Sequence, residues 1–240
     1  LNLGGVYTDI GNLVEAEKSF KKAILLKPEL AVAHSNLGGV LKDLGKFREA
    51  KDSVSKAIKL DPNLAMAYSN LSGILKNSGD LKQAEVIVRK AIKLEPNLDN
   101  AFLNLGGILY AQGKFDQAEI ATKRAIELKP NLAYAYVILA GVKNAKREQD
   151  KAILYIKKAM ELKPNLPSAY VVMGSILMEQ GKLNEAERAL VKSLDLDKNL
   201  ASSYLGLSKL TDYSNHKELK KYLLSINLEA IEDPSHKIDF

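Results

Sequence analysis

The sequence predicts an all-α chain built as a solenoid of antiparallel helix pairs. The residues Asn-Leu-Gly-Gly occur at 2–5, 36–39 and 104–107, and the variant Asn-Leu-Ser-Gly occurs at 70–73, always with a spacing of 34. Proline, glycine and alanine return in the same register. A fixed period of this length is typical of a stack of small units, each of which buries its apolar face against its neighbours.

Residues 65–98 show the pattern within one unit. The apolar or small stripe of the predicted first helix consists of Ala65, Ala67, Tyr68, Leu71, Ser72 and Leu75. Gly79 ends this helix, because glycine accepts a positive φ, and Asp80 is expected to cap the next helix. The stripe of the second helix consists of Leu81, Ala84, Val88, Ala91 and Ile92. Pro96 ends it, since proline cannot continue a helix.

The period divides the chain into successive predicted units. They are residues 1–30 (lacking the start of its first helix), 31–64, 65–98, 99–132, 133–166, 167–200, 201–226 (a degenerate unit or capping helices) and 227–240 (the start of a further helix). The incomplete unit at each end predicts that the chain is a segment of a longer protein.

The turn at 144–150 departs from the pattern. Arg147 stands where the other units have glycine, and Gln149 stands where they have Leu or Phe. A repeat that tolerates a looser turn and a flexible joint both fit this change, and we favour the looser turn.

The spacing resembles the tetratricopeptide repeat (TPR) family over residues 1 to about 205. The residues that carry the resemblance are Tyr68, Leu71-Ser72, Gly79, Ala84, Ala91 and Pro96, with their equivalents in the other units. The resemblance implies a right-handed superhelix in which the first helices line the concave side and the second helices form the outside.

Small residues recur where each first helix should press on its partner. They are Gly4, Gly38, Ser72, Gly106, Ala140 and Gly174. Small side chains let two helix backbones approach closely. A leucine at Gly106 is therefore expected to cost about 1 to 3 kcal/mol of stability through overpacking.

The resemblance places one asparagine per unit on the concave side: Asn2, Asn36, Asn70 and Asn104. Because a carboxamide both donates and accepts hydrogen bonds, such a ladder can pair with the main chain of an extended peptide. It resembles the concave surface of the TPR domain of O-linked N-acetylglucosamine transferase. The alternative is that each asparagine bonds within its own hairpin.

Small residues flank the ladder and are expected to expose the backbone to another main chain. They are Gly5, Gly39, Gly73, Gly107 and Gly141, with Ser35 and Ser69. The alternative is that these glycines relieve packing between adjacent first helices. The residues expected to edge the polar part are Lys42, Asp43, Lys76, Asn77 and Tyr110. The ladder ends at Ile138 and Val172, so the later units should present a more apolar surface.

Composition excludes several classes of function. Without cysteine there is no disulfide, thiolate nucleophile or cysteine-bound zinc, and no apolar run reaches 18 residues. The formal net charge is +6, but the basic residues lie mainly on predicted second helices among acids, which is typical of a solvated face. His34 stands at a position filled elsewhere by Tyr or Phe, so we interpret it as a core substitution. No catalytic constellation, cofactor or metal site is predicted, and neither nucleic acid nor a membrane is expected as a partner.

The sequence therefore predicts a non-enzymatic interaction scaffold that binds an extended segment of a partner protein. The alternative is the substrate-recruiting arm of a larger transferase, since the array resembles bacterial TPR arrays that precede sulfotransferase-like or glycosyltransferase domains. A cytoplasmic location is expected. Partner identity and oligomeric state are left open.

Overall fold

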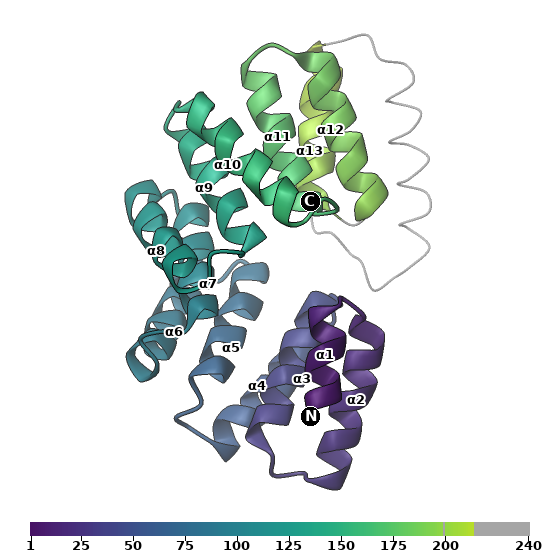
Figure 1. Ribbon diagram of the computed structural model, residues 1–240, viewed down its shortest axis with the longest axis vertical. Helices are drawn as coiled ribbons and strands as arrows, with labels where there is room; N and C mark the ends of the chain where they lie inside the picture. Colours follow the sequence, from purple (N-terminus) through teal and green to yellow (C-terminus); the bar gives the residue numbers. More distant parts are fainter. Residues whose placement is uncertain (199, 214–240) are drawn as a thin grey trace. The chain divides into compact units, whose positions relative to one another are not determined.

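The computed structural model describes residues 1–198 and 200–213, which form thirteen α-helices and no strand. The first helices of the pairs are α1 (Asn2–Asp9), α3 (Ala31–Asp43), α5 (Ala65–Asn77), α7 (Asp99–Ala111), α9 (Ala133–Ala145), α11 (Pro167–Glu179) and α13 (Ala201–Tyr213). The second helices are α2 (Leu13–Leu26), α4 (Phe47–Leu60), α6 (Leu81–Leu94), α8 (Phe115–Leu128), α10 (Gln149–Leu162) and α12 (Leu183–Leu196). The predicted all-α solenoid of helix pairs is confirmed (Figure 1).

Residues in the left-handed region close the turns inside the hairpins. Five of them are glycines with φ between 73 and 81°: Gly11, Gly45, Gly79, Gly113 and Gly181. After Gly79, Asp80 Oδ1 accepts a hydrogen bond of 3.2 Å from the Gln83 amide at the start of α6. Asp80 is thus the N-cap that the sequence predicts.

The turn at 144–150 keeps the geometry of the glycine turns. Arg147 has a φ of 63°. Its amide donates to the Asn144 carbonyl at 2.9 Å, just as the amide of Gly45 donates to the Lys42 carbonyl at 3.0 Å. The hydrogen bonds of this turn are therefore no looser than those of the glycine turns. The left-handed backbone conformation of Arg147 is unfavourable for a residue that has a Cβ atom.

The small residues on the first helices are required by packing, as predicted. A Cβ atom at Gly38 would collide with Cγ2 of Val54, and one at Gly174 would lie 2.8 Å from Cγ of Leu190. Alanines on the second helices are fully buried at the same contacts: Ala16, Ala50, Ala84, Ala118, Ala152 and Ala186. The backbone of the first helix thus packs directly against side chains of the second helix at these glycines.

The chain divides into two compact units, residues 1–138 (unit 1) and residues from 139 onward (unit 2). The core of unit 1 includes Phe20, Leu41 and Val54. In unit 2, Leu190 and Leu194 of α12 pack with α13 in one buried cluster. Helix α13 is the first helix predicted for residues 201–226, whereas the helices expected at 216–226 and 227–240 lie outside the described residues.

Successive first helices of unit 1 lie side by side. Helix α3 contacts α5, and α5 contacts α7, but no two second helices in the described part of unit 1 make contacts of similar extent. The spacing is therefore tighter on the side of the first helices, and unit 1 bends toward them. We call the exposed side of α3, α5 and α7 that carries Asn36, Asn70 and Asn104 the ladder face.

Acids with little exposed side-chain surface on the second helices connect neighbouring hairpins. Glu85 accepts from Lys114 Nζ of the next hairpin at 2.9 Å and from Arg89 Nη2 of its own helix at 2.8 Å. These hydrogen bonds, the one from Lys114 first, lower the pKa of Glu85 to about 2. Glu17 repeats the arrangement with Lys21 and Lys46.

The substitution Glu85→Gln is expected to lower the free energy of unfolding by about 0.5 to 1 kcal/mol at pH 7, because the basic partners are partly exposed. The pKa of Glu85 is depressed in the folded state, so its contribution is present above about pH 4.5 and is lost as the pH falls toward 2. Urea unfolding of both proteins from pH 7 to pH 2.5 tests this. A difference that stays constant over that range would contradict the assignment.

Candidate functional site

Two asparagines of the ladder bind the preceding first helix. Asn70 Nδ2 donates to the carbonyl of Ser35 at 3.0 Å and to its Oγ at 3.2 Å. Asn104 Nδ2 donates to the carbonyl of Ser69 at 2.9 Å and to its Oγ at 3.1 Å. The ladder thus connects neighbouring repeats rather than the two helices of one hairpin.

These contacts fix how each carboxamide points. A main-chain carbonyl can only accept, so the NH₂ group must face the serine and the oxygen must face away. Among the described residues, nothing donates to Oδ1 of Asn70 or Asn104, and neither oxygen is buried without a partner. Both residues are half-buried, so each presents a carboxamide oxygen to solvent on the ladder face.

The contact between asparagine and serine also explains the role of the serines and the position at which the ladder ends. Ser35 and Ser69 are buried, so they act on a ligand only through the asparagines that they orient. One unit further along, Leu103 stands at the serine position and Ile138 stands at the asparagine position that would pair with it. Serine and asparagine therefore disappear together.

The remaining ladder asparagines are less constrained. Asn36 is half-buried and Asn2 is exposed, and the hydrogen bonds of the described residues include none from either side chain. The serine position that would face Asn36 is Leu1. The ladder thus has two anchored members and two that keep both donor and acceptor for a partner.

Glycines beside the ladder have room for a side chain. The nearest atom to a Cβ built at Gly39 is Asn70 Nδ2 at 3.4 Å, and the nearest atoms at Gly107 lie at 3.6 Å. At Gly5 nothing lies within 4 Å. These distances are ordinary van der Waals contacts, so packing between first helices does not require glycine there.

Lysine side chains lie across these glycines. Lys42 Cδ is 3.4 Å from the Cβ position of Gly73, and Asn104 Nδ2 is 3.8 Å from the same point. Lys76 Nζ is 3.6 Å from the Cβ position of Gly107. Each lysine therefore extends over the next first helix, and the structure brings both onto the ladder face.

The two lysines differ in their partners. Lys42 Nζ lies 3.1 Å from Asp43 Oδ1. Lys76 has no carboxylate within ion-pair distance among the described residues. Burial, and then the positive charge of Lys42, lower the pKa of Lys76.

The other predicted edge residues lie further out. Asn77 is exposed at the end of α5. Tyr110 is 36 % exposed, and its ring centroid is 5.9 Å from that of Phe115. Beyond the last ladder asparagine, where the sequence predicts a more apolar surface, Tyr134 is 49 % exposed on α9. In unit 2, Val172 is half-buried on α11.

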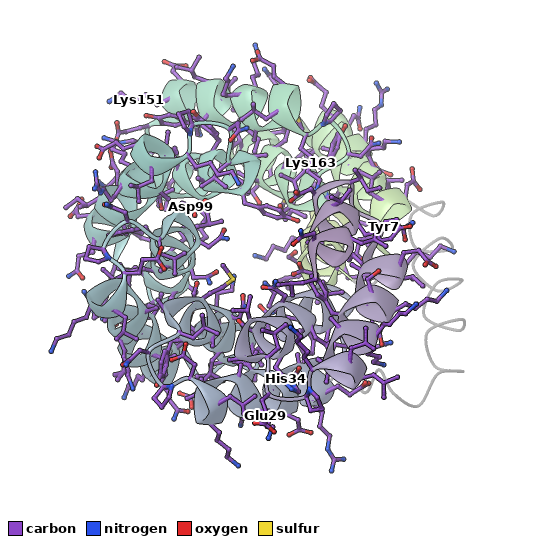
Figure 2. All side chains as sticks on the ribbon, turned by 60° about the horizontal axis from the view of Figure 1, so that its bottom comes forward. Tyr7, Glu29, His34, Asp99, Lys151 and Lys163 are labelled. Carbon is purple, nitrogen blue, oxygen red and sulfur yellow. The ribbon has the colours of Figure 1, made fainter. Side chains whose placement is uncertain are left out.

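His34 is not a core residue, so that interpretation is wrong. Its Nε2 lies 2.8 Å from the carbonyl of Pro28, near the loop that also carries Glu29 (Figure 2). The hydroxyl of Tyr68 donates to the carbonyl of Pro62 at 3.0 Å in the same way. His34 therefore takes the place of tyrosine in a hydrogen bond to the loop. In both cases the carbonyl partner lies six residues earlier in the chain, so the sequence spacing could have revealed this role.

A depression of about 570 Å³ lies away from the ladder residues, along α6, α7 and α8. It is lined by Arg89, Ile120 and Arg124, among others. No cluster of three or more potential metal-ligating side chains occurs within the part of the chain that the structure describes. The helices described here include none that is long and apolar enough to span a bilayer.

Comparisons with known proteins agree with this architecture. Sequence profiles of the tetratricopeptide repeat match residues 1–30, 31–64, 133–166 and 167–200, and a further one matches 76–139. The fold is similar to a chain in the crystal structure of the APC/C hetero-tetramer Cut9-Hcn1, with a TM-score of 0.71, 17 % identity, and coverage of 87 % of this chain and 41 % of that one. It is also similar to Pseudomonas aeruginosa PilF, with a TM-score of 0.58, 23 % identity, and coverage of 84 % and 90 %. No match is found among curated protein sequences.

The protein belongs to the tetratricopeptide repeat family, since the profiles match more than half of the chain. It is a protein of repeated helix pairs. The chain spans well under half the length of its Cut9-Hcn1 structural relative.

Proposed function

We propose that the ladder face binds an extended segment of a partner protein through the main chain of that segment. The observation that carries the proposal is the orientation of Asn70 and Asn104. Each donates inward to a buried serine and leaves its Oδ1 toward solvent. A fixed row of acceptors suits the N–H groups of an extended chain, whatever its side chains are.

The glycines support a close approach of that chain. A helical glycine costs about 1 kcal/mol relative to alanine, yet packing does not require Gly39 or Gly107. The atoms nearest to these positions belong to side chains of neighbouring first helices, Asn70 at Gly39 and Ile138 with Lys76 at Gly107. A second main chain can therefore approach the helix backbone without meeting a side chain of the glycine itself.

The spacing of helices fits an extended segment. Packed helices lie about 8 to 10 Å apart, and an extended chain rises about 3.3 Å per residue. Successive asparagines therefore meet roughly every third residue of the bound segment. From Asn36 to Asn104 the ladder accommodates about seven residues at that spacing.

Charge pairing favours a protein over a nucleic acid as the partner. Several basic side chains in the second helices of unit 1, or at the residue just before one, are paired with acids: Lys21 and Lys46 with Glu17, Arg89 and Lys114 with Glu85, and Lys123 with Glu119. Pairing with acids lowers the excess charge that these side chains offer to phosphates.

The test is to replace Asn36, Asn70 and Asn104 together with alanine. Peptides are selected from a random displayed library on the unaltered protein, and their affinities for both proteins are measured by fluorescence anisotropy. At about 0.5 to 1.5 kcal/mol per lost hydrogen bond, we expect affinity to fall at least about 10-fold.

The matched control replaces the exposed residues Asn63, Asn100 and Asn131 with alanine. This variant should bind as the unaltered protein does. Circular dichroism and the melting temperature verify that both variants are folded. Unchanged affinity in a folded ladder variant would refute the proposal.

The role of substrate-recruiting arm of a sulfotransferase-like or glycosyltransferase protein stays a prediction. The coding sequence beyond Phe240 tests it. An open reading frame that continues into such a domain is the expected result, and a stop codon within a few dozen codons would contradict it.

A further inference from the structure

From the placement of Lys42 and Lys76 we infer that the ladder face selects segments that carry carboxylate side chains, an inference that rests on the proposed peptide binding. The two lysines come from equivalent positions of successive first helices, α3 and α5. Each extends over a glycine of the next first helix. Their ammonium groups thus lie on the surface where the asparagine oxygens are presented.

Only one of these two lysines has a carboxylate within ion-pair distance among the described residues. Lys42 lies 3.1 Å from Asp43, and Asp43 is largely exposed. Lys76 has no acidic partner among the described residues, although its side chain is half-buried. A cation withdrawn from water without a counter-charge costs free energy, and an anionic ligand would remove that cost.

Electrostatics within the site agree with this arrangement. The pKa of Lys76 is lowered by burial and by repulsion from Lys42. A bound carboxylate would raise that pKa, because it stabilises the charged ammonium. The ammonium of Lys76 can still be reached by a ligand, since it is not among the buried unpaired polar atoms of the described residues.

These contacts give the asparagines and the lysines of the ladder face different roles in binding. Asn104 and the stem of Lys42 lie within 4 Å of one point, the Cβ position of Gly73. A segment whose amide donates to Asn104 Oδ1 would thus carry a neighbouring side chain close to the lysines. The asparagines fix the main chain, and the lysines choose acidic side chains.

Three synthetic 12-residue peptides test the inference. They share a neutral Gly/Ser/Ala background and carry Glu-Glu, Gln-Gln or two phosphoserines at the centre. Binding is followed by the ¹³Cε chemical shifts of the lysines and by fluorescence anisotropy at low salt. We expect the Glu-Glu peptide to bind at least about 10-fold more tightly than the Gln-Gln peptide, and the Lys76 pKa to rise on binding.

The variants Lys42→Met and Lys76→Met keep the stem and remove the charge. The double variant should bind the Glu-Glu and Gln-Gln peptides equally, whereas the control Lys56→Met, at an exposed position on α4, should keep the preference. Equal binding of these two peptides by the unaltered protein, or a preference that survives in the folded double variant, would overturn the inference. Tighter binding of the phosphoserine peptide would overturn the choice of carboxylate.

Failure here is distinguishable from failure of the proposed peptide binding. If only the acidic preference is absent, the Gln-Gln peptide still loses affinity when Asn36, Asn70 and Asn104 become alanine. If the ladder face binds no peptide, the asparagine variant binds all three peptides as the unaltered protein does.

Discussion

Alanine at Gly106 is expected to lower the free energy of unfolding by about 1 to 3 kcal/mol, whereas alanine at the adjacent Gly107 is expected to raise it by about 0.5 to 1 kcal/mol. A Cβ at Gly106 would collide with Oγ1 of Thr122. That hydroxyl is fully buried and donates to the Ala118 carbonyl at 2.7 Å, so it cannot move away without losing a hydrogen bond. At Gly107 the nearest atoms are 3.6 Å away, so only the gain in helix propensity remains.

Urea unfolding of the two single variants measures this difference of sign. Gly38 and Gly39 form a second pair, because a Cβ at Gly38 meets Val54 and one at Gly39 has 3.4 Å of clearance. Destabilisation of similar size at Gly107 and Gly106 would contradict the assignment of Gly107 to an open face.

The substitution Arg147→Gly is expected to raise the free energy of unfolding by about 1 kcal/mol. Arg147 holds a φ of 63°, and a left-handed conformation costs a residue with a Cβ about 1 to 2 kcal/mol. Part of this gain is offset, because glycine also gains entropy in the unfolded chain. The Arg147 side chain is 83 % exposed, and its pair with Glu179 spans 3.9 Å, so little is lost with it.

Thermal and urea unfolding of this variant provide the measurement, and Arg147→Ala is the matched control. Alanine keeps the Cβ and removes the guanidinium, so it should leave stability within about 0.5 kcal/mol. A stabilisation of equal size in both variants would show that the guanidinium, and not the backbone, is the source.

Local rules predicted the helices well, because glycine, proline and alanine act within one hairpin. Gly79 accepts a positive φ and Asp80 caps α6, and neither effect depends on distant residues. The small residue at Gly38 was also predictable, since equivalent close contacts recur at Gly4, Gly106 and Gly174. The turn at Arg147 was interpreted less well, because the hydrogen bonds around it restore a geometry that its own propensity opposes.

The candidate site could be predicted only in part. The period gives the positions of Asn70 and Asn104, but the direction of each carboxamide depends on the distance to the preceding first helix. The buried position of Ser35 follows from the same distance. Likewise, the sequence places Lys76 at an edge, but the missing counter-charge appears only when the neighbouring hairpins are in place.

The central claim is that an extended segment lies on the ladder face, and NMR mapping of a selected peptide tests it most directly. In a spectrum with labelled side-chain amides, we expect the largest shifts at Asn36, Asn70 and Asn104 and at the main-chain amides of Gly39 and Gly107. Shifts confined to the second helices α4, α6 and α8, with the three asparagines unchanged, would contradict the account.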